Sequence, residues 1–393
     1  MRIGPRSASP DAWRIVSTRA LRGFADGVVS VLLVAHLSSL GYSPFQIGVV
    51  VTGTLVGSAA LTLAVGLAAH RYAARAVLLS ACVLMAITGI GFAAATAFWV
   101  VLSVAVIGTM NPSAGDVSVF LPTEQALLAD QVDPPERTHL YAIYNLGGSF
   151  AGALGALASG VPDLLGITRR AGFLVTAAVA AVMAMVYRTL PRTTVDDSQV
   201  RTALGPSRVT VLKLAALFSL DSAGSGFAVQ SILVLWLHLR FDLSVATTGA
   251  VFFGVGLLTA LSQLAAAPLA RRIGLVPTMV GTHLPASLLL IVAAFAPTAP
   301  VAVGLLFARA LLSQMDVPAR QALVMAVVTP AERAAAASVT NVPRSLASAT
   351  TPALAGLLLS QSHVGWPLVI AGVTKATYDL LLLAMSRRLA PVN

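Results

Sequence analysis

The chain has 393 residues, of which 57% are hydrophobic and only 10% are charged, and its net charge is +10. This composition excludes a water-soluble globular domain of this length and indicates that the bilayer is the solvent of most of the chain. A basic surplus is also typical of nucleic-acid-binding proteins, but these residues follow the predicted membrane topology, so we expect no nucleic-acid partner.

Apolar stretches recur from about Phe24 onward, each close to the roughly 20 residues that a helix needs to cross the hydrocarbon core. Helices are required because lipid offers no hydrogen bonds to backbone groups. The predicted spans are 17–40, 46–69, 76–97, 98–123, 139–160, 169–189, 211–239, 246–270, 276–297, 300–322, 338–360 and 366–386. We therefore predict an all-α membrane protein with 12 transmembrane helices and both termini on one side.

The basic residues indicate the orientation of these helices. With the N-terminus inside, most of the 25 lysine and arginine residues fall on cytoplasmic flanks and loops, whereas Arg169, Arg170 and Arg240 fall outside. The positive-inside rule therefore predicts a multi-pass protein of the inner (plasma) membrane with both termini cytoplasmic. The first helix lacks the small-residue cleavage site of a secretory signal, so we expect it to stay uncleaved.

The longest polar interruption of the chain lies between Arg188 and Lys213, at mid-chain. It predicts a cytoplasmic linker at 191–210 between an N-terminal six-helix bundle at 1–190 and a C-terminal six-helix bundle at 211–393. Each bundle begins and ends on the cytoplasmic side, because an even number of spans returns the chain to the side on which it started.

A self-comparison also indicates two related halves. The segment PTEQALLADQVDPPERTHLYAIYN, from Pro122, aligns without gaps on PARQALVMAVVTPAERAAAASVTN, from Pro318. The matches include polar positions, such as Asn145 on Asn341, which chance identity from shared alanine and leucine would not produce. The repeats are parallel, because six helices in each half bring the chain back to the same side.

Two cytoplasmic loops at equivalent places in the halves carry a sequence motif. Residues 66–75 read GLAAHRYAAR, and residues 267–274 read APLARRIG. Both resemble the pattern Gly-x-Leu-Ala-Asp-Arg-x-Gly-Arg-Arg of the major facilitator superfamily, with His70 and Arg271 at the acidic position. With the repeated halves, these loops make the chain similar to members of that superfamily over nearly its whole length.

The resemblance implies two pseudo-symmetric six-helix bundles that rock against each other about a central substrate site. It also implies a transporter rather than an enzyme, working as a monomer without a cofactor. The loop arginines Arg71, Arg75 and Arg272 are then candidates for structural or gating residues. The alternative is that they act only as topology anchors.

Ionisable side chains inside the predicted helices are functional candidates, because each costs at least ~2.5 kcal/mol in the bilayer. They are Asp26, Asp116, Asp221, Arg309, Asp316, Lys375 and Asp379. The resemblance implies that the first, fourth, seventh and tenth helices line the central cavity, and most of these residues lie on them. Lys375 and Asp379 lie on the twelfth helix at a spacing of i, i+4, which predicts a structural ion pair.

Four of these acids lie at similar predicted depths, two in each half. The proton-coupling candidates are Asp26, Asp116, Asp221 and Asp316. If the two acids of a half face each other, burial and like charge favour the binding of a proton. The alternative is that they neutralise Arg19, Arg22 or Arg344 near the inner interface.

Arg309 is the predicted charge closest to mid-bilayer. It would either hold an anionic substrate group or pair with a carboxylate. That carboxylate could be Asp316, which lies seven residues later on the same helix face, or one on the seventh helix. Asn111, Gln230 and Asn341 are further substrate-binding candidates, although interhelical hydrogen bonding is an equally simple role for Asn341.

The leading hypothesis is a secondary transporter that moves a small solute by alternating access and couples this movement to protons. Short loops, a mostly apolar predicted cavity and the absence of sugar- or peptide-porter motifs favour efflux of small organic compounds by antiport. Transport of a small organic or inorganic anion is the alternative that Arg309 supports. A non-transporting receptor or a channel is the alternative from another class. The six histidines lack metal-ligand spacing, so we expect no metal site.

Overall fold

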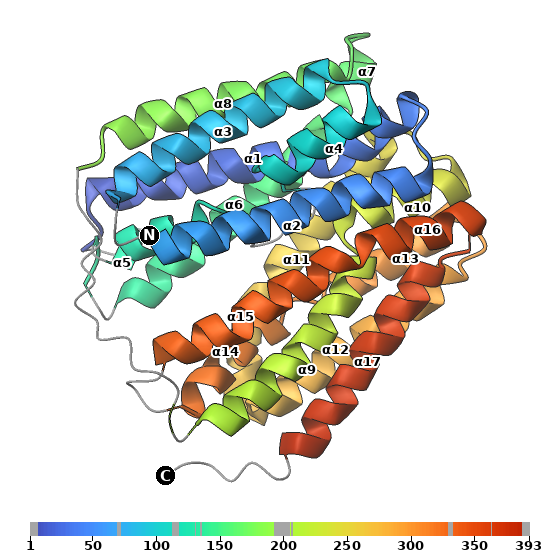
Figure 1. The fold of residues 1–393 in the computed structure, drawn as a ribbon. Coiled ribbons are helices and arrows are strands. Elements are labelled where there is room, and N and C mark those ends of the chain that lie inside the picture. Colours follow the sequence, from blue (N-terminus) through green and yellow to red (C-terminus); the bar gives the residue numbers. More distant parts are fainter. Residues whose placement is uncertain are drawn as a thin grey trace. The chain divides into compact units, whose positions relative to one another are not determined.

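The computed structural model describes residues 7–68, 72–111, 118–129, 131–133, 136–191, 205, 207–328, 333–362 and 364–386. No β-strand occurs in these ranges, and the chain runs from one α-helix to the next (Figure 1). Eight helical stretches in the described part are long and apolar enough to cross a membrane. They are Pro10–Ser39, Pro44–Val65, Ala74–Ala94, Arg170–Arg188, Arg208–Phe241, Val245–Ile273, Leu275–Ala294 and Trp366–Ser386. The other predicted spans contain shorter or less apolar helices, so the total of 12 stays a prediction.

Residues 1–198 and 243–253 form one compact unit, which we call the first half. Its helices are α1 (Pro10–Ser39), α2 (Pro44–Ala68), α3 (Ala74–Ala94), α4 (Phe98–Ile107), α5 (Leu121–Ala129), α6 (Arg137–Ala158), α7 (Val161–Leu164) and α8 (Arg170–Arg188). The predicted span 98–123 therefore holds one short helix, α4, and the beginning of another, α5.

Residues 199–242 and 254–393 form the second unit, which we call the second half. Its helices are α9 (Arg208–Phe227), α10 (Gln230–Phe241), α11 (Val245–Ile273, which begins in the first unit), α12 (Leu275–Ala294), α13 (Ala299–Ala310), α14 (Asp316–Ala326), α15 (Arg333–Thr350), α16 (Pro352–Gln361) and α17 (Trp366–Ser386). Several predicted spans are thus two short helices in series, as in α13 and α14.

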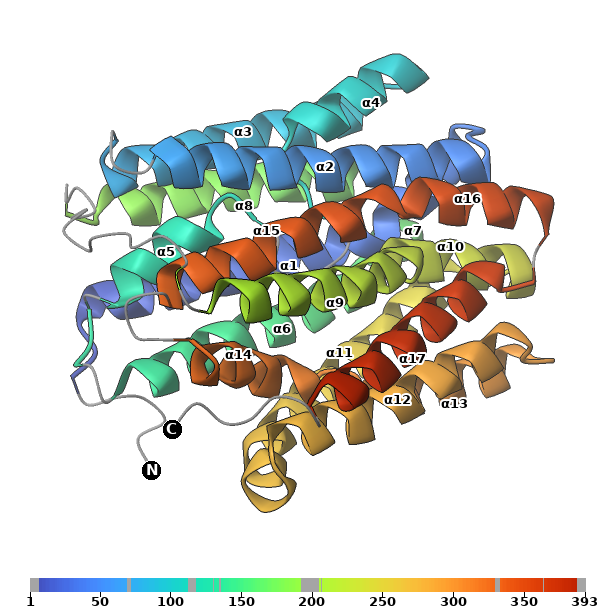
Figure 2. The same cartoon turned by 60° about the horizontal axis from the view of Figure 1, so that its bottom comes forward.

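The packing inside the two units follows one scheme. In the first half, α1 packs against α6 and α8, and α3 packs against α8. In the second half, α9 packs against α15 and α17, and α12 packs against α17. Figures 1 and 2 show α12 and α17 side by side from both directions. When the predicted spans are numbered within each half, the first packs against the fifth and sixth, and the third packs against the sixth. The order is the same in both halves, as expected for parallel repeats.

Small residues allow α1 and α6 to approach closely. A Cβ atom added to Gly27 would collide with the backbone of Gly152, and one added to Gly155 would collide with the backbone of Phe24. Glycines at such contacts let two helix backbones meet directly, which favours van der Waals packing where lipid removes the hydrophobic driving force. This packing fixes the position of α1, which carries several of the polar groups described below.

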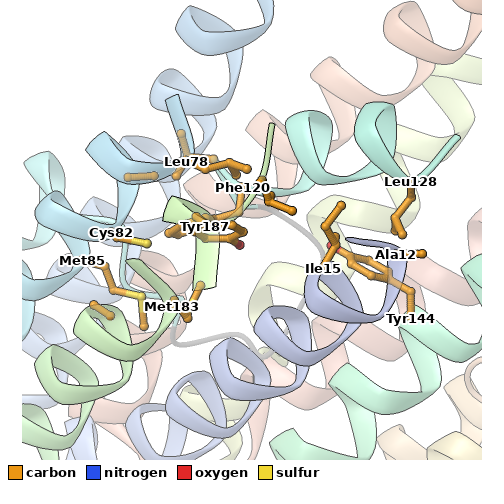
Figure 3. Close-up of a cluster of buried hydrophobic side chains, with 14 of the residues drawn as sticks. Ala12, Ile15, Leu78, Cys82, Met85, Phe120, Leu128, Tyr144, Met183 and Tyr187 are labelled. Carbon is orange, nitrogen blue, oxygen red and sulfur yellow. The ribbon is translucent and has the colours of Figure 1, made fainter. Parts of the chain in front are cut away.

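The core at one end of the first half is aromatic and aliphatic (Figure 3). Phe120 and Tyr187 stack with their ring centroids 6.4 Å apart, and Tyr144 lies beside Ile15 of α1. The equivalent core of the second half includes Phe218 of α9 and Tyr378 of α17. In both halves, hydroxyl groups of the core tyrosines are buried among charged side chains, which the next section describes.

Candidate functional site

The second half contains a buried cluster of charged side chains from four helices, which we call the ionic cluster. Its members are Asp221 on α9, His283 on α12, Asp316 and Arg320 on α14, and Lys375 and Asp379 on α17. All of them are at least nine-tenths buried. Charges in such a place are retained only when they are paired, so the contacts within the cluster decide what it can do.

Asp221 is the centre of this cluster. The ammonium Nζ of Lys375 donates a hydrogen bond to its Oδ1 at 2.8 Å, and the guanidinium of Arg320 donates to its Oδ2 at 3.2 Å. Lys375 Nζ also donates to Ser225 Oγ, one helical turn from Asp221, at 2.7 Å. The carboxylate therefore holds one cation on each oxygen and ties α9 to both α14 and α17.

Asp316 and Asp221 do not form the like-charge pair that the sequence predicts. Arg320 Nη1 lies 3.3 Å from Asp316 Oδ2 and 3.2 Å from Asp221 Oδ2, so one guanidinium is shared by both acids. The same guanidinium lies 5.8 Å from the ring centroid of Phe218. A positive charge between two carboxylates removes the repulsion that would favour a proton on either of them.

The predicted ion pair between Lys375 and Asp379 is also wrong. Lys375 binds Asp221, and the carboxylate oxygens of Asp379 both lie 3.0 Å from His283 Nδ1. The i, i+4 spacing does place the two side chains on one face of α17. That face is turned to α9 and α12, which carry the partners that the two side chains contact.

His283 lies between two carboxylates. Its Nδ1 contacts Asp379 at 3.0 Å, and its Nε2 is 3.4 Å from Asp221 Oδ1. A neutral imidazole donates from one nitrogen only, whereas an imidazolium donates from both. An imidazolium could therefore interact with both carboxylates, and the ring of Tyr378 packs edge-on at 5.8 Å.

The ionic cluster contains acids and bases in similar number. Asp221, Asp316 and Asp379 carry three negative charges, and Lys375 and Arg320 carry two positive ones. Arg344 of α15, which donates to Ser222 Oγ at 3.2 Å, adds a third positive charge that acts on Asp221 and Asp316, and this pairing lowers the cost of burying the acids. In the sequence alone His283 is an isolated histidine, because its partners lie on distant segments of the chain.

The first half holds a different buried carboxylate, Glu124 on α5, with 0% exposure. Arg22 donates to its Oε2 at 2.7 Å, as does the hydroxyl of Tyr144 at 2.5 Å. The hydroxyls of Tyr187 and Thr18 donate to its Oε1 at 2.5 and 3.2 Å. All of its acceptor positions are thus used by one arginine and three hydroxyls, which is typical of a structural anchor.

Glu124 is not among the candidates predicted from the sequence, although the repeat contains the necessary signal. In the alignment of the halves, Glu124 falls on Arg320. The two ion pairs therefore use the same positions with opposite charge: Arg22 with Glu124 in one half, and Asp221 with Arg320 in the other. Arg22 forms its ion pair with Glu124, and it acts on Asp26 only through electrostatics, so the alternative that an intramembrane aspartate neutralises Arg22 stays a prediction.

Asp26 of α1 lines a cavity of about 10 Å³ inside the first half. The other lining residues are Val29, Met85, Thr88, Thr109, Met110 and Thr176, so its walls come from α1, α3, α8 and the segment after α4. Within the described residues, Asp26 makes no ion pair, and it is 8% exposed. Its side chain thus faces the interior of its own bundle.

The remaining substrate-binding candidates lie apart from the ionic cluster. Arg309, near the end of α13, is partly exposed and makes no ion pair with a described residue; its predicted partner Asp316 binds Arg320 instead. Asn111 is buried, and Gln230 is the first residue of α10. Asn341 accepts a hydrogen bond from Arg344 at 3.2 Å, a contact within α15.

The loop candidates differ in their surroundings. Arg75, at the start of α3, donates to the backbone oxygen of Leu190 at 3.2 Å and so joins that end of α3 to the end of α8. Arg272 is exposed in the last turn of α11. Arg71 and Asp116 lie outside the described residues. A gating role for these arginines stays a prediction.

Comparison with known protein families identifies one family. The family model described as Major Facilitator Superfamily matches residues 15–239 and 214–392. The uncharacterized membrane protein YJR124C of Saccharomyces cerevisiae is 25% identical over 424 residues, which cover 97% of this chain and 95% of that protein.

Solved structures of low identity share the fold over nearly their whole length. The nucleoside transporter NupG has a TM-score of 0.73 at 17% identity, covering 96% of this chain and 100% of that chain. A bacterial homolog of the human lysosomal transporter Spinster, inward-facing and occupied, has a TM-score of 0.74 at 16% identity, covering 96% of each chain. A D-xylose-proton symporter has a TM-score of 0.73 at 16% identity, covering 94% of this chain and 97% of that chain. With both halves matched, this chain belongs to the major facilitator superfamily of membrane transporters.

Proposed function

We propose that this transporter couples the movement of a small solute across the inner membrane to protons, and that His283 is the group that binds the proton. The observation that supports this is the position of the imidazole between the carboxylates of Asp221 and Asp379, at 3.4 and 3.0 Å. Loss of that proton would remove one positive charge from a buried cluster that joins four helices, and a local charge change of this kind shifts a conformational equilibrium.

The proposed direction is efflux of small organic compounds by antiport. It rests on the short loops and the mostly apolar predicted cavity, and Asp26, Asp116 and Asp316 remain further candidates for proton coupling. A structure of similar fold is named a D-xylose-proton symporter, which supports the proton as coupling ion, and another is named a nucleoside transporter. Because the proteins of similar fold carry different solutes, the solute class is best identified by testing a panel of compounds.

The test uses purified protein in liposomes that contain the pH dye pyranine. A panel of nucleosides, monosaccharides, organic anions and lipophilic cations is added outside, and saturable proton movement identifies a transported class. We expect His283→Gln to lower solute-driven proton movement about tenfold or more, because the coupling free energy of such a site is about 1–3 kcal/mol. His139→Gln, at an exposed position of α6, is the matched control. Wild-type proton movement in His283→Gln would refute this role.

Transport of an anion is a second candidate function, favoured by Arg309. The guanidinium of Arg309 has no ion pair with a described residue, and Asp221 acts on it only through electrostatics. The guanidinium is therefore available to bind a carboxylate or phosphate of a substrate. We expect Arg309→Gln to weaken binding of the organic anions in the panel about tenfold or more, since hydrogen bonds to charged groups contribute about 1.5–3 kcal/mol. Binding of uncharged solutes should be unchanged. Arg208→Gln, exposed at the start of α9, is the control, and equal anion affinity in both variants would exclude this role.

A further inference from the structure

The cavity beside Asp26 contains polar atoms that the described residues leave unpaired. The hydroxyl oxygens of Thr109 and Thr176 are buried and have no hydrogen-bond partner among these residues. Thr176 is only 3% exposed, and both threonines line the cavity together with Asp26 and Thr88. A buried carboxylate and two unpaired hydroxyls around one space need an occupant that satisfies all of them.

The backbone around the cavity adds negative potential. Helix α4 ends at Ile107, and the chain continues in extended conformation from Gly108. Thr109 and Met110, which line the cavity, therefore follow directly on the carboxyl end of a helix that stops within a predicted membrane span. The carbonyl groups at such an end carry partial negative charge, and broken helices of this kind coordinate cations in other transporters.

The second half shows what a buried acid on the first helix of a half requires. Asp26 and Asp221 both lie on the first helix of their half and face the third and sixth helices. Asp221 receives an ammonium group from Lys375 on the sixth helix, α17. The sixth helix of the first half, α8, offers Asp26 only the hydroxyl of Thr176. The cation that the second half supplies as a side chain is thus missing from the side chains that line the first-half cavity.

The nearby arginines do not take that place. Arg22 is bound to Glu124 at 2.7 Å, and the guanidinium of Arg19 lies 5.7 Å from the ring centroid of Tyr144. Both act on Asp26 through electrostatics, and neither lines the cavity. The space beside the carboxylate is lined instead by threonines and apolar side chains.

The chemistry of the lining selects the ion. The charged and hydroxyl groups of the lining, from Asp26 and three threonines, present oxygen atoms, which suit a hard cation. One carboxylate is too little negative charge for a typical divalent site, which argues for a monovalent ion. The volume of about 10 Å³ admits one water-sized particle, so the smaller Na⁺ fits better than K⁺. The Thr88 hydroxyl donates to the Leu84 carbonyl at 2.7 Å and accepts from the backbone N–H of Thr109 at 3.4 Å, which leaves one lone pair for a cation.

We propose that this cavity binds a single sodium ion, held by the carboxylate of Asp26 and the hydroxyl oxygens of Thr88, Thr109 and Thr176. The site lies wholly within the first half and is independent of the proton site at His283. Binding of Na⁺ joins α1, α3 and α8 to the end of α4, so it stabilises the folded first half.

The test measures thermal unfolding of the purified full-length protein at constant ionic strength in choline chloride, with NaCl or KCl replacing choline stepwise. We expect a saturable rise of the unfolding temperature by about 2 °C or more with Na⁺ and no rise with K⁺. Asp26→Asn and Thr176→Val should abolish the rise, and both should abolish saturable ²²Na⁺ binding. Asp163→Asn, in an exposed ion pair with Arg169, should keep both.

Several results would overturn the sodium site. One is an equal response to Na⁺, K⁺ and choline, and another is an unchanged Na⁺ response in Asp26→Asn. Stabilisation by acid alone, with no effect of Na⁺, would assign the cavity to a proton or a water molecule instead. If Asp26→Asn does not fold, Thr176→Val decides the question, because it removes one hydroxyl and no charge. Binding is read without any transported solute, so a negative result leaves proton coupling at His283 untouched.

Discussion

Replacing Glu124 by alanine is expected to destabilise the first half by about 3–5 kcal/mol, the cost of removing one partner from a buried ion pair. Arg22 would keep its charge in an apolar environment, and the hydroxyls of Tyr144 and Tyr187 would lose their acceptor. The measurement is the unfolding temperature of the purified protein, followed by the yield of folded protein on size-exclusion chromatography.

Two control variants distinguish the contribution of the Arg22–Glu124 ion pair to stability from that of its surroundings. The double variant Arg22→Leu/Glu124→Leu removes both charges and should recover a large part of the loss, because apolar replacement of a buried ion pair is often neutral. Asp163→Asn removes an acid from an exposed pair and should change stability by about 1 kcal/mol or less. A single Glu124→Ala variant as stable as the wild type would show that Glu124 is not an anchor.

The fold could be predicted from the sequence because hydrophobic length and the repeat are local and additive signals. Apolar runs gave helices at the expected places, and matching polar positions such as Asn145 and Asn341 indicated two related halves. The breaks within spans were harder to predict. In α9 and α10 the interruption at Ala228 and Val229 follows a run of glycine and serine, whose effect depends on neighbouring helices.

The partners of the charged residues could not be predicted in the same way. A buried charge takes whichever opposite charge the tertiary packing brings closest, and several partners were available for each. Lys375 had Asp379 on its own face, yet it binds Asp221 across the bundle. His283 had no ligand-like neighbour in sequence, although two carboxylates contact it in the structure. Burial could be inferred from sequence in both cases, whereas pairing required the fold.

Asp221→Asn is expected to abolish solute-driven proton movement in the pyranine assay, with a loss of about tenfold or more. Asparagine keeps the shape of the side chain but removes the charge that Lys375 and Arg320 share. His283 then loses the acceptor near its Nε2, and the cluster carries an excess positive charge, so a proton on the imidazole becomes unfavourable. Folding should also weaken, because two buried cations are left with fewer partners.

A second substitution distinguishes the structural part of this effect from the functional part. In Asp221→Asn/Lys375→Met, the unpaired ammonium is gone, so the unfolding temperature should return toward that of the wild type. Proton movement should stay low, because the carboxylate near His283 is still absent. If the double variant recovers both stability and proton movement, Asp221 serves only to neutralise Lys375, and the proton must bind elsewhere. If it recovers stability alone, the carboxylate of Asp221 has two roles: it stabilises the second half and it interacts with the proton-binding imidazole. Movement of the proton would then be coupled directly to rearrangement of α9, α12 and α17.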